Sequence, residues 1–512
     1  GTAYGQNERL EQAISCYRQA LAMQPDDFEI RLDLGVVCGM DDHPEEAIHH
    51  FEQCWKMRPD DARSCIALSD AYVSVGRFDE AIAISRSYLA RFPDHETVHS
   101  NLIIYMDHTP SLEDAEIQAE RKAWGRRFCP VLTARKPLAN SPDPQRKLKI
   151  GYVSSYFHNH SAANAFAAPM VHHDPEHYET FAYQTLVGSG DFVTDIFKSR
   201  TTHWREVERL SDDQLEALIR QDGIDILVDL MGHAGHNRLR IFARRPAPVS
   251  VSAWGYDHGT GLEAMDYLFS DPLAIPPESR CHFAEEIYDL PCGIHLMPFL
   301  TMPKAGPLPA LKNGYLTLGV FARSNKISQP MIPMWAEILR QIPESRLFLK
   351  LSQRNMDYFR PMLTERFVNE GIDPARIRVE GWTPQRAHFK LYREIDFQLD
   401  TYPTGAAVTG LESLRMGVPL VSLYGANHAS RYTASFMHNL GVEGWVATTR
   451  EAYVERAVER AADLPALAAL RASLRERFDA SLLGDHLSYA RAVEAAYRQM
   501  WHRWCAEQGT VS

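Results

Sequence analysis

The stretch DTYPTGAAVTGLESLRMGVPLV, residues 400–421, carries the pattern from which we predict the fold of this chain. The run 396–400 before the turn is typical of a strand, and a turn rich in Pro and Gly follows it. A helical pattern continues until Gly417 ends it, and Pro419 opens a second apolar run, 420–423. This order of strand, turn, helix and strand predicts a unit of a parallel α/β sheet.

The turn of this unit places free backbone N–H groups at a helix N-terminus, where a phosphate group is favoured. Glu412 lies in the early turns of the same helix. A carboxylate there can accept hydrogen bonds from a ribose diol, so the unit predicts a site for a nucleotide sugar. An ordinary connection between helix and strand, with a solvated Glu412, would show the same pattern, and the residues alone leave both interpretations open.

Residues 412–421, ESLRMGVPLV, resemble the donor-site motif E-x-L-x-x-G-x-P-x-V of two-domain glycosyltransferases of the GT-B type. More narrowly, the chain from about residue 148 to 501 resembles the protein O-linked N-acetylglucosamine transferases and their bacterial relatives. The resemblance implies two Rossmann-like domains with a cleft between them, a UDP-sugar donor and a protein acceptor.

The composition is that of an ordinary globular protein, with 45% hydrophobic and 23% charged residues, and 512 residues allow about three or four domains. A net charge of −12 offers no overall basic surface, so we expect no nucleic acid as a partner. The eight cysteines form no C-x-x-C pair, which favours a reducing compartment over disulfides or zinc. With no apolar run of membrane length and no signal peptide, we expect a cytoplasmic protein and no membrane contact.

The N-terminal part of the chain repeats with a period of 34 residues. A small residue in mid-helix and a proline after the second helix are typical of tetratricopeptide repeats. Such a solenoid offers a concave surface, so we expect polypeptide acceptors to bind along it, a passive spacer being the alternative. The residues that keep the spacing are Ala13, Ala47 and Ala81, and Pro25, Pro59 and Pro93.

Two regions of alternating strands and helices follow the repeats. The predicted fold class is an α-helical tetratricopeptide-like solenoid followed by an α/β GT-B fold, that is, two Rossmann-like domains with a cleft between them. A C-terminal helix that returns to the first catalytic domain is implied by the resemblance alone. The expected segments are the repeats with an adaptor helix (1–128), a linker (129–146), the N-terminal Rossmann-like catalytic domain (147–301), a hinge (302–313), the C-terminal donor-binding domain (314–484) and the returning helix (485–512).

Glycosyl transfer from a UDP-sugar needs positive charge at the departing phosphate and a group beside the acceptor hydroxyl. Lys326 lies in the loop after the first strand of the second domain, and the resemblance assigns it to the diphosphate, with Arg323 as a secondary donor contact. His160 follows the strand 147–154 and matches the histidine proposed as catalytic base in the family. We expect His160 to be an essential active-site residue, whether or not it is the base.

The resemblance implies further contacts to each part of the donor. A segment around His388 would pack on uracil, a helix N-terminus would hold the phosphates, and a second Gly-rich loop, GYDHGTG at 255–261, would line the sugar and the acceptor. The residues assigned are Thr383, Gln385, His388, Ala407, Val408, Thr409 and Glu412 for the donor, and Tyr256, Gly259 and Thr260 for the sugar and acceptor loop.

The sequence departs from the animal members of the family at three places. Gln385 stands where they have lysine, AAVT at 406–409 stands where they have Gly-His-Thr-Thr, and Asp257-His258 replaces a proline. A cradle of backbone N–H groups survives such changes, because it does not depend on side chains. The lost histidine and hydroxyl are the best support for a rival interpretation, a repeat scaffold whose transferase domain binds UDP but turns over little.

We therefore expect an inverting, metal-independent transferase that moves N-acetylglucosamine from UDP-GlcNAc to Ser or Thr hydroxyls of proteins. No metal is expected, because the sequence has no D-x-D pair and a lysine with backbone amides can stabilise the diphosphate. The close alternative is a UDP-sugar transferase with another sugar or acceptor, such as glucose to Asn. The donor groups all lie beyond residue 320, so we expect deletion of residues 1–93 to leave the affinity for UDP nearly unchanged.

Overall fold

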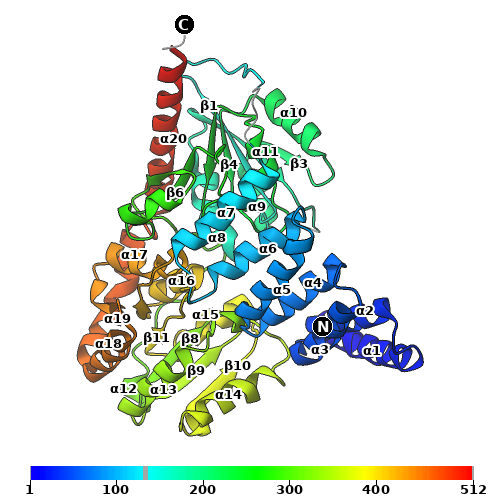
Figure 1. Cartoon of the computed structure of the whole chain (residues 1–512). Helices are drawn as coiled ribbons and strands as arrows, with labels where there is room; N and C mark the ends of the chain where they lie inside the picture. The colour runs from blue at the N-terminus through cyan, green and yellow to red at the C-terminus, as the bar shows by residue number, and fades with distance from the viewer. Residues whose placement is uncertain (1, 131–135, 189, 510–512) are drawn as a thin grey trace.

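The computed structural model describes residues 2–130, 136–188 and 190–509. It consists of an α-helical solenoid and two parallel α/β domains (Figure 1). Residues 131–135 of the expected linker, and the ends of the first and last expected segments at 1 and 510–512, lie outside the described residues. The segment limits expected from the sequence stay predictions.

The solenoid is built from antiparallel helices that pack closely in pairs. Ala47 and Ala81, the small residues of the period, are buried, and a Cβ atom on Gly35 would lie 2.5 Å from the ring of Phe51 in the next helix. The packing therefore requires the small residues that define the repeat. The helices are α1 (Thr2–Met23), α2 (Phe28–Met40), α3 (Pro44–Met57), α4 (Ala62–Ser74), α5 (Phe78–Arg91), α6 (Glu96–Asp107) and α7 (Asp114–Phe128).

The first α/β domain holds a seven-stranded parallel sheet with the strand order β3-β2-β1-β4-β5-β6-β7. The pattern of buried runs did not predict β3, because its four residues are polar or only half-buried. The elements are β1 (Leu148–Ser154), α8 (Ser161–His172), β2 (Tyr178–Gln184), α9 (Phe192–Arg200), β3 (His203–Glu206), α10 (Asp212–Asp222), β4 (Ile226–Asp229), α11 (Leu239–Ala243), β5 (Val249–Ser252), β6 (Tyr267–Ser270), η1 (Pro277–His282) and β7 (Glu286–Asp289).

The second α/β domain holds a six-stranded parallel sheet with the order β10-β9-β8-β11-β12-β13. Its elements are α12 (Ala310–Asn313), β8 (Thr317–Phe321), η2 (Ser324–Lys326), α13 (Met331–Gln341), β9 (Arg346–Lys350), α14 (Phe359–Asn369), η3 (Pro374–Arg376), β10 (Ile377–Glu380), α15 (Gln385–Leu391), β11 (Phe397–Leu399), α16 (Val408–Arg415), β12 (Leu420–Leu423), η4 (His428–Ser430), α17 (Tyr432–Asn439), η5 (Glu443–Trp445), β13 (Val446–Ala447), α18 (Arg450–Ala462) and α19 (Leu464–Ala480).

The two strand orders locate the ligand crevices. Chain direction across the sheet reverses between β1 and β4 in the first domain and between β8 and β11 in the second. Ligands of doubly wound sheets bind at the carboxyl ends of the strands beside such a reversal. The loops after β1, β8 and β11 are therefore the places to look for a site.

The last helix, α20 (His486–Gly509), packs along the first domain (Figure 1). The Tyr178 hydroxyl donates to the carbonyl oxygen of Glu494 at 2.9 Å, and the Trp254 indole donates to the Tyr489 hydroxyl at 2.7 Å. The chain thus crosses from the second domain back to the first.

Buried polar contacts join the two domains beside the Gly-rich loop. The Tyr432 hydroxyl donates to Asp257 Oδ1 at 2.6 Å, and His428 Nε2 lies 3.6 Å from Asp257 Oδ2. The backbone N–H of His428 and the guanidinium of Arg431 donate to Asp114, the first residue of α7. Asp257, which replaces the family proline together with His258, therefore belongs to the contact between the domains.

Candidate active site

Asp400, at the carboxyl end of β11, organises the loop 401–407. Its Oδ1 accepts the N–H groups of Thr401 and Ala406 at 2.9 and 2.8 Å, and its Oδ2 accepts the hydroxyls of Ser422 and Thr433 at 2.7 and 2.6 Å. The carboxyl group is buried, and burial raises its pKa while these hydrogen bonds oppose the shift. The buried carboxylate thus joins two N–H groups of the loop to hydroxyls of β12 and α17.

The loop 401–407 leads directly into the N-terminus of α16. The N–H groups of Gly410 and Leu411 donate to the carbonyl oxygen of Ala407 at 3.0 and 3.1 Å. The N–H groups of Val408 and Thr409 therefore precede the first helical hydrogen bond, where the helix dipole also favours an anion. This is the backbone cradle expected at Ala407, Val408 and Thr409; its role in holding phosphate stays a prediction.

Lys326 brings a cation to this loop from the neighbouring strand β8. Its Nζ donates to the carbonyl oxygen of Gly405 at 2.9 Å. Burial, and after it the nearby charge of Arg323, lower the pKa of Lys326 to about 8, while Asp400 opposes the shift. The structure thus brings together the lysine and the cradle that the sequence assigned to the same diphosphate.

His160 is the N-cap of α8, and Arg323 of the second domain is close enough for its charge to act on the ring. Its Nδ1 accepts the N–H of Ala162 at 3.2 Å, and its ring stacks on Tyr156 with centroids 4.0 Å apart. Burial, and after it the charge of Arg323, lower the pKa of His160 to about 4. The ring is therefore neutral near pH 7, and because Nδ1 is an acceptor, its proton is on Nε2.

Glu412 and His388 form a half-enclosed aromatic corner beside the cradle. The His388 ring contacts the rings of Phe321 and Tyr392, with centroids 5.6 and 5.3 Å away, and these two rings also contact each other. His388 Nε2 is 3.8 Å from Glu412 Oε2. Burial raises the pKa of Glu412 to about 7, while burial and then Lys350 lower the pKa of His388 to about 4. Aromatic side chains with one carboxylate among them suit the binding of a nucleobase and its ribose.

Thr383 and Gln385 lie at the entrance to this corner, where α15 begins. Among the described residues, the buried hydroxyl of Thr383 has no hydrogen-bond partner, and Gln385 is the first residue of the helix. A buried hydroxyl without a partner is costly, and a ligand atom would satisfy it. The assignment of both residues to the uracil edge stays a prediction.

The Gly-rich loop 255–261 packs mainly against the adaptor helix. The Tyr256 hydroxyl donates to Asp107, Thr260 donates to Glu285 at 2.5 Å, and Gly259 has the positive φ of 88°. A Cβ atom on Gly125 would lie 2.4 Å from the Gly261 carbonyl oxygen, so α7 and the loop meet backbone to backbone. The contacts of Tyr256 and Gly261 join the loop to the solenoid, whereas Thr260 bonds within the first α/β domain. The expected contact of Tyr256, Gly259 and Thr260 with sugar or acceptor stays a prediction.

Two residues of the site were missed by sequence reasoning. Asp400 could have been found, because it stands at the carboxyl end of a strand, directly before the turn. His108 could not, because it follows α6 in the solenoid; its Nδ1 lies 2.5 Å from the hydroxyl of Thr404. Which residue of the repeats meets the loop depends on how the solenoid docks, and no local pattern encodes that.

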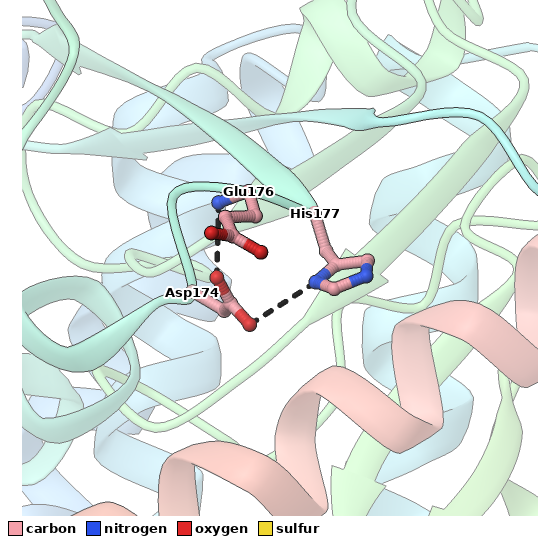
Figure 2. Close-up of side chains that lie close together, drawn as sticks. All are labelled: Asp174, Glu176 and His177. Carbon is pink, nitrogen blue, oxygen red and sulfur yellow. Dashed lines mark hydrogen bonds and ion pairs between the residues drawn. The ribbon is translucent and has the colours of Figure 1, made fainter.

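A cluster of possible metal ligands lies far from this site in the fold. Within the described residues, Asp174, Glu176 and His177 form one such group, and their bonds to one another close a turn (Figure 2). They precede β2 and so lie at the amino ends of the strands, whereas the loops of the site follow the carboxyl ends. Nothing connects this exposed turn with the chemistry of the cleft.

The solenoid, the two Rossmann-like domains and the crevice loops between them define a repeat-bearing glycosyltransferase of the GT-B type. Residues 133–299 and 310–493 match the family described as Glycosyl transferase family 41, and residues 1–40 and 40–102 match tetratricopeptide repeat families. The chain belongs to glycosyl transferase family 41.

Relatives of this family were found by sequence and by structure. The chain is 34% identical over 421 residues to a probable UDP-N-acetylglucosamine–peptide N-acetylglucosaminyltransferase, SPINDLY, of Solanum lycopersicum, and the match covers 81% of this chain and 45% of the relative. It therefore spans about half the length of that relative. The solved structure of a mutant O-GlcNAc transferase of Thermobaculum terrenum superposes with a TM-score of 0.89 at 30% identity, over 99% of this chain and 97% of that one.

No helix in the part of the chain that the structure describes has the length and hydropathy needed to cross a bilayer.

Proposed function

We propose that the protein transfers N-acetylglucosamine from UDP-GlcNAc to Ser or Thr hydroxyls of polypeptides, with inversion and without a metal. The observation that carries the proposal is the bond from Lys326 Nζ to the Gly405 carbonyl, beside the free N–H groups of α16. An anion at this place meets a lysine and a helix N-terminus together. The names of the relatives supply the sugar and the peptide acceptor.

In an inverting transfer the acceptor oxygen attacks in one step, opposite the departing diphosphate. Positive charge aimed at the leaving oxygen supplies most of the stabilisation that such a step needs. We assign this task to Lys326 and to the amides of Val408 and Thr409. The guanidinium of Arg323 makes no hydrogen bond or ion pair with any described residue, and we assign it to the donor as well. These groups can balance the charge of a diphosphate without a metal ion.

His160 is better suited to donate a hydrogen bond than to act as the catalytic base. Because its Nδ1 accepts the Ala162 N–H, its neutral ring presents an Nε2–H to the cleft. Such a group can donate a hydrogen bond to the sugar or the acceptor, but it cannot take the acceptor's proton without first losing its own. We propose His160 as an essential hydrogen-bond donor and leave the base unassigned.

Calorimetric titration tests the donor half of this proposal. UDP and UDP-GlcNAc should bind with similar affinity in the presence and the absence of EDTA, and uridine should bind more weakly because it lacks the diphosphate. GDP and GDP-sugars serve as matched controls. Preference for another nucleotide by about tenfold or more, or loss of binding in EDTA, would overturn the proposed donor or the metal independence, respectively.

A further inference from the structure

The turns inside the repeats dock onto the loops of the second domain. The carboxylate of Asp42, in the turn after α2, accepts the backbone N–H groups of Arg354 and Asn355 at 2.8 and 3.0 Å. The carbonyl oxygen of Ser74, at the end of α4, accepts the Ser324 hydroxyl at 3.0 Å. In each case a turn of the solenoid meets a loop at the carboxyl end of the second sheet.

The third turn continues this series and reaches the cradle itself. His108 follows α6 and lies one period of 34 residues after Ser74. Its Nδ1 is 2.5 Å from the Thr404 hydroxyl. Three successive turns thus contact the loops after β9, β8 and β11, which are three adjacent strands in the sheet. Each successive turn of the repeats therefore meets the loop of the next strand in the sheet. The turn at His108 contacts the loop 401–407, which we assign to the phosphates.

The imidazole of His108 is held firmly in this position. It stacks on Phe78 of α5 with ring centroids 5.4 Å apart. The preceding residue, Asp107, is buried and pairs with the guanidinium of Arg121 at 2.6 Å, while Tyr256 donates to the same carboxylate. Packing from two helices and from the Gly-rich loop fixes the turn, so the ring can act as a rigid support for Thr404.

The position of Thr404 affects the shape of the cradle directly. The Thr404 carbonyl accepts the hydroxyl of Thr401 at 2.7 Å, which closes the turn. The next carbonyl, that of Gly405, is the acceptor of Lys326. A shift of Thr404 would therefore move both the cradle and the atom that orients the lysine.

We propose that the solenoid supplies a positioning residue to the donor site: His108 holds Thr404, and through it the Gly405 carbonyl and Lys326, in the arrangement that a nucleoside diphosphate requires. The inference rests on the proposed function, because it assigns the loop to the diphosphate. It gives the repeats a role in donor binding, in addition to any role in holding the acceptor.

The test is calorimetric titration of UDP into the full chain and its variants. His108→Ala and Thr404→Val each should weaken binding about fivefold or more, and the double variant should be no weaker than the poorer single one, because both changes remove the same bond. His108→Asn, whose amide takes the place of Nδ1, should restore binding to within about threefold. In transfer assays the KM for the donor should rise in His108→Ala, while the KM for the acceptor stays the same.

The matched control is His95→Ala. His95 caps the other end of α6, where its Nδ1 accepts the N–H of Val98 at 3.3 Å, so this variant weakens the same helix without touching the loop. It should bind UDP within about twofold of wild type. If His108→Ala binds UDP as tightly as wild type, or if His95→Ala and His108→Asn lose as much affinity as His108→Ala, the positioning role is overturned. A wild type that does not bind UDP overturns the proposed function first, and the inference with it.

Discussion

Lys326 Nζ lies 2.9 Å from the Gly405 carbonyl oxygen, so a charged hydrogen bond joins the loops after the two central strands of the second sheet. The ammonium group is held beside the cradle before any donor arrives. An electrostatic group that is already in place needs no reorganisation when charge develops on the leaving phosphate. The proposed catalytic role of Lys326 therefore depends on this fixed position as well as on its charge.

Replacing Lys326 with Ala should abolish transfer while the fold persists. Loss of a cation at the developing diphosphate charge costs on the order of 3 kcal/mol or more, which is at least about a hundredfold in kcat. Single-turnover transfer rates and thermal melting measure the two effects separately. Lys312→Ala, an exposed lysine of α12 in the same domain, is the control. Activity of Lys326→Ala within about threefold of wild type would remove Lys326 from the mechanism.

Binding of UDP-GlcNAc should depend on pH through Glu412 and Lys326. Burial raises the pKa of Glu412 to about 7, and the ribose needs the ionised acceptor, so affinity should rise as pH increases through that value. The pKa of Lys326 is lowered to about 8, so affinity should fall again as the ammonium loses its proton above that value. In Glu412→Gln the affinity should no longer rise as pH increases through about 7, and the binding of uridine should be weakened as much as the binding of UDP. If Glu412→Gln weakened the binding of pyrophosphate but not that of uridine, the proposed contact between Glu412 and the ribose would be wrong.

The contact between His428 and Asp257 should make the stability of the domain contact depend on pH. Burial opposes protonation of His428, but the carboxylate of Asp257, 3.6 Å away, raises its pKa above the ordinary 6.5. Stability from this pair is therefore complete below the unfolded pKa and is lost as pH rises through the folded value. Urea unfolding of wild type and His428→Gln should differ more at about pH 6 than at about pH 8. A difference that does not change with pH would show that the pair is not charged.

Much of the architecture could be predicted because it is local in the sequence. The period of 34 fixed the helix pairs, and buried runs marked β1 and β8 to within two residues. The short edge strand β13, only two residues long, left no such pattern. The general geometry of strand–loop–helix units indicated where Lys326 and Glu412 lie, and the resemblance to the family supplied their proposed roles. The role of Asp257 in the contact between the domains could not be predicted from the sequence, because its partners His428 and Tyr432 are distant in the chain.

The docked turns change one expectation from the sequence. Deletion of residues 1–93 was expected to leave UDP affinity nearly unchanged, because the donor groups lie beyond residue 320. The deletion removes Asp42 and Ser74, which bond to loops of the donor domain, and Phe78, on which His108 stacks. We now predict a lower melting temperature and weaker UDP binding in the truncated protein, with UDP restoring part of the stability by mass action. Unchanged affinity in a stable truncated protein would show that these contacts do not shape the donor site.

The central claim is that the cleft transfers N-acetylglucosamine to protein hydroxyls from a donor held by Lys326 and the cradle. Incubation of the full chain with labelled UDP-GlcNAc and a cell lysate, in EDTA, tests it most directly. We expect label in protein bands, released by alkaline β-elimination as for a Ser or Thr linkage, with the β anomer formed from the α-linked donor. The Lys326→Ala variant should give none. UDP binding without any protein labelling, or labelling only from a different nucleotide sugar, would contradict the account.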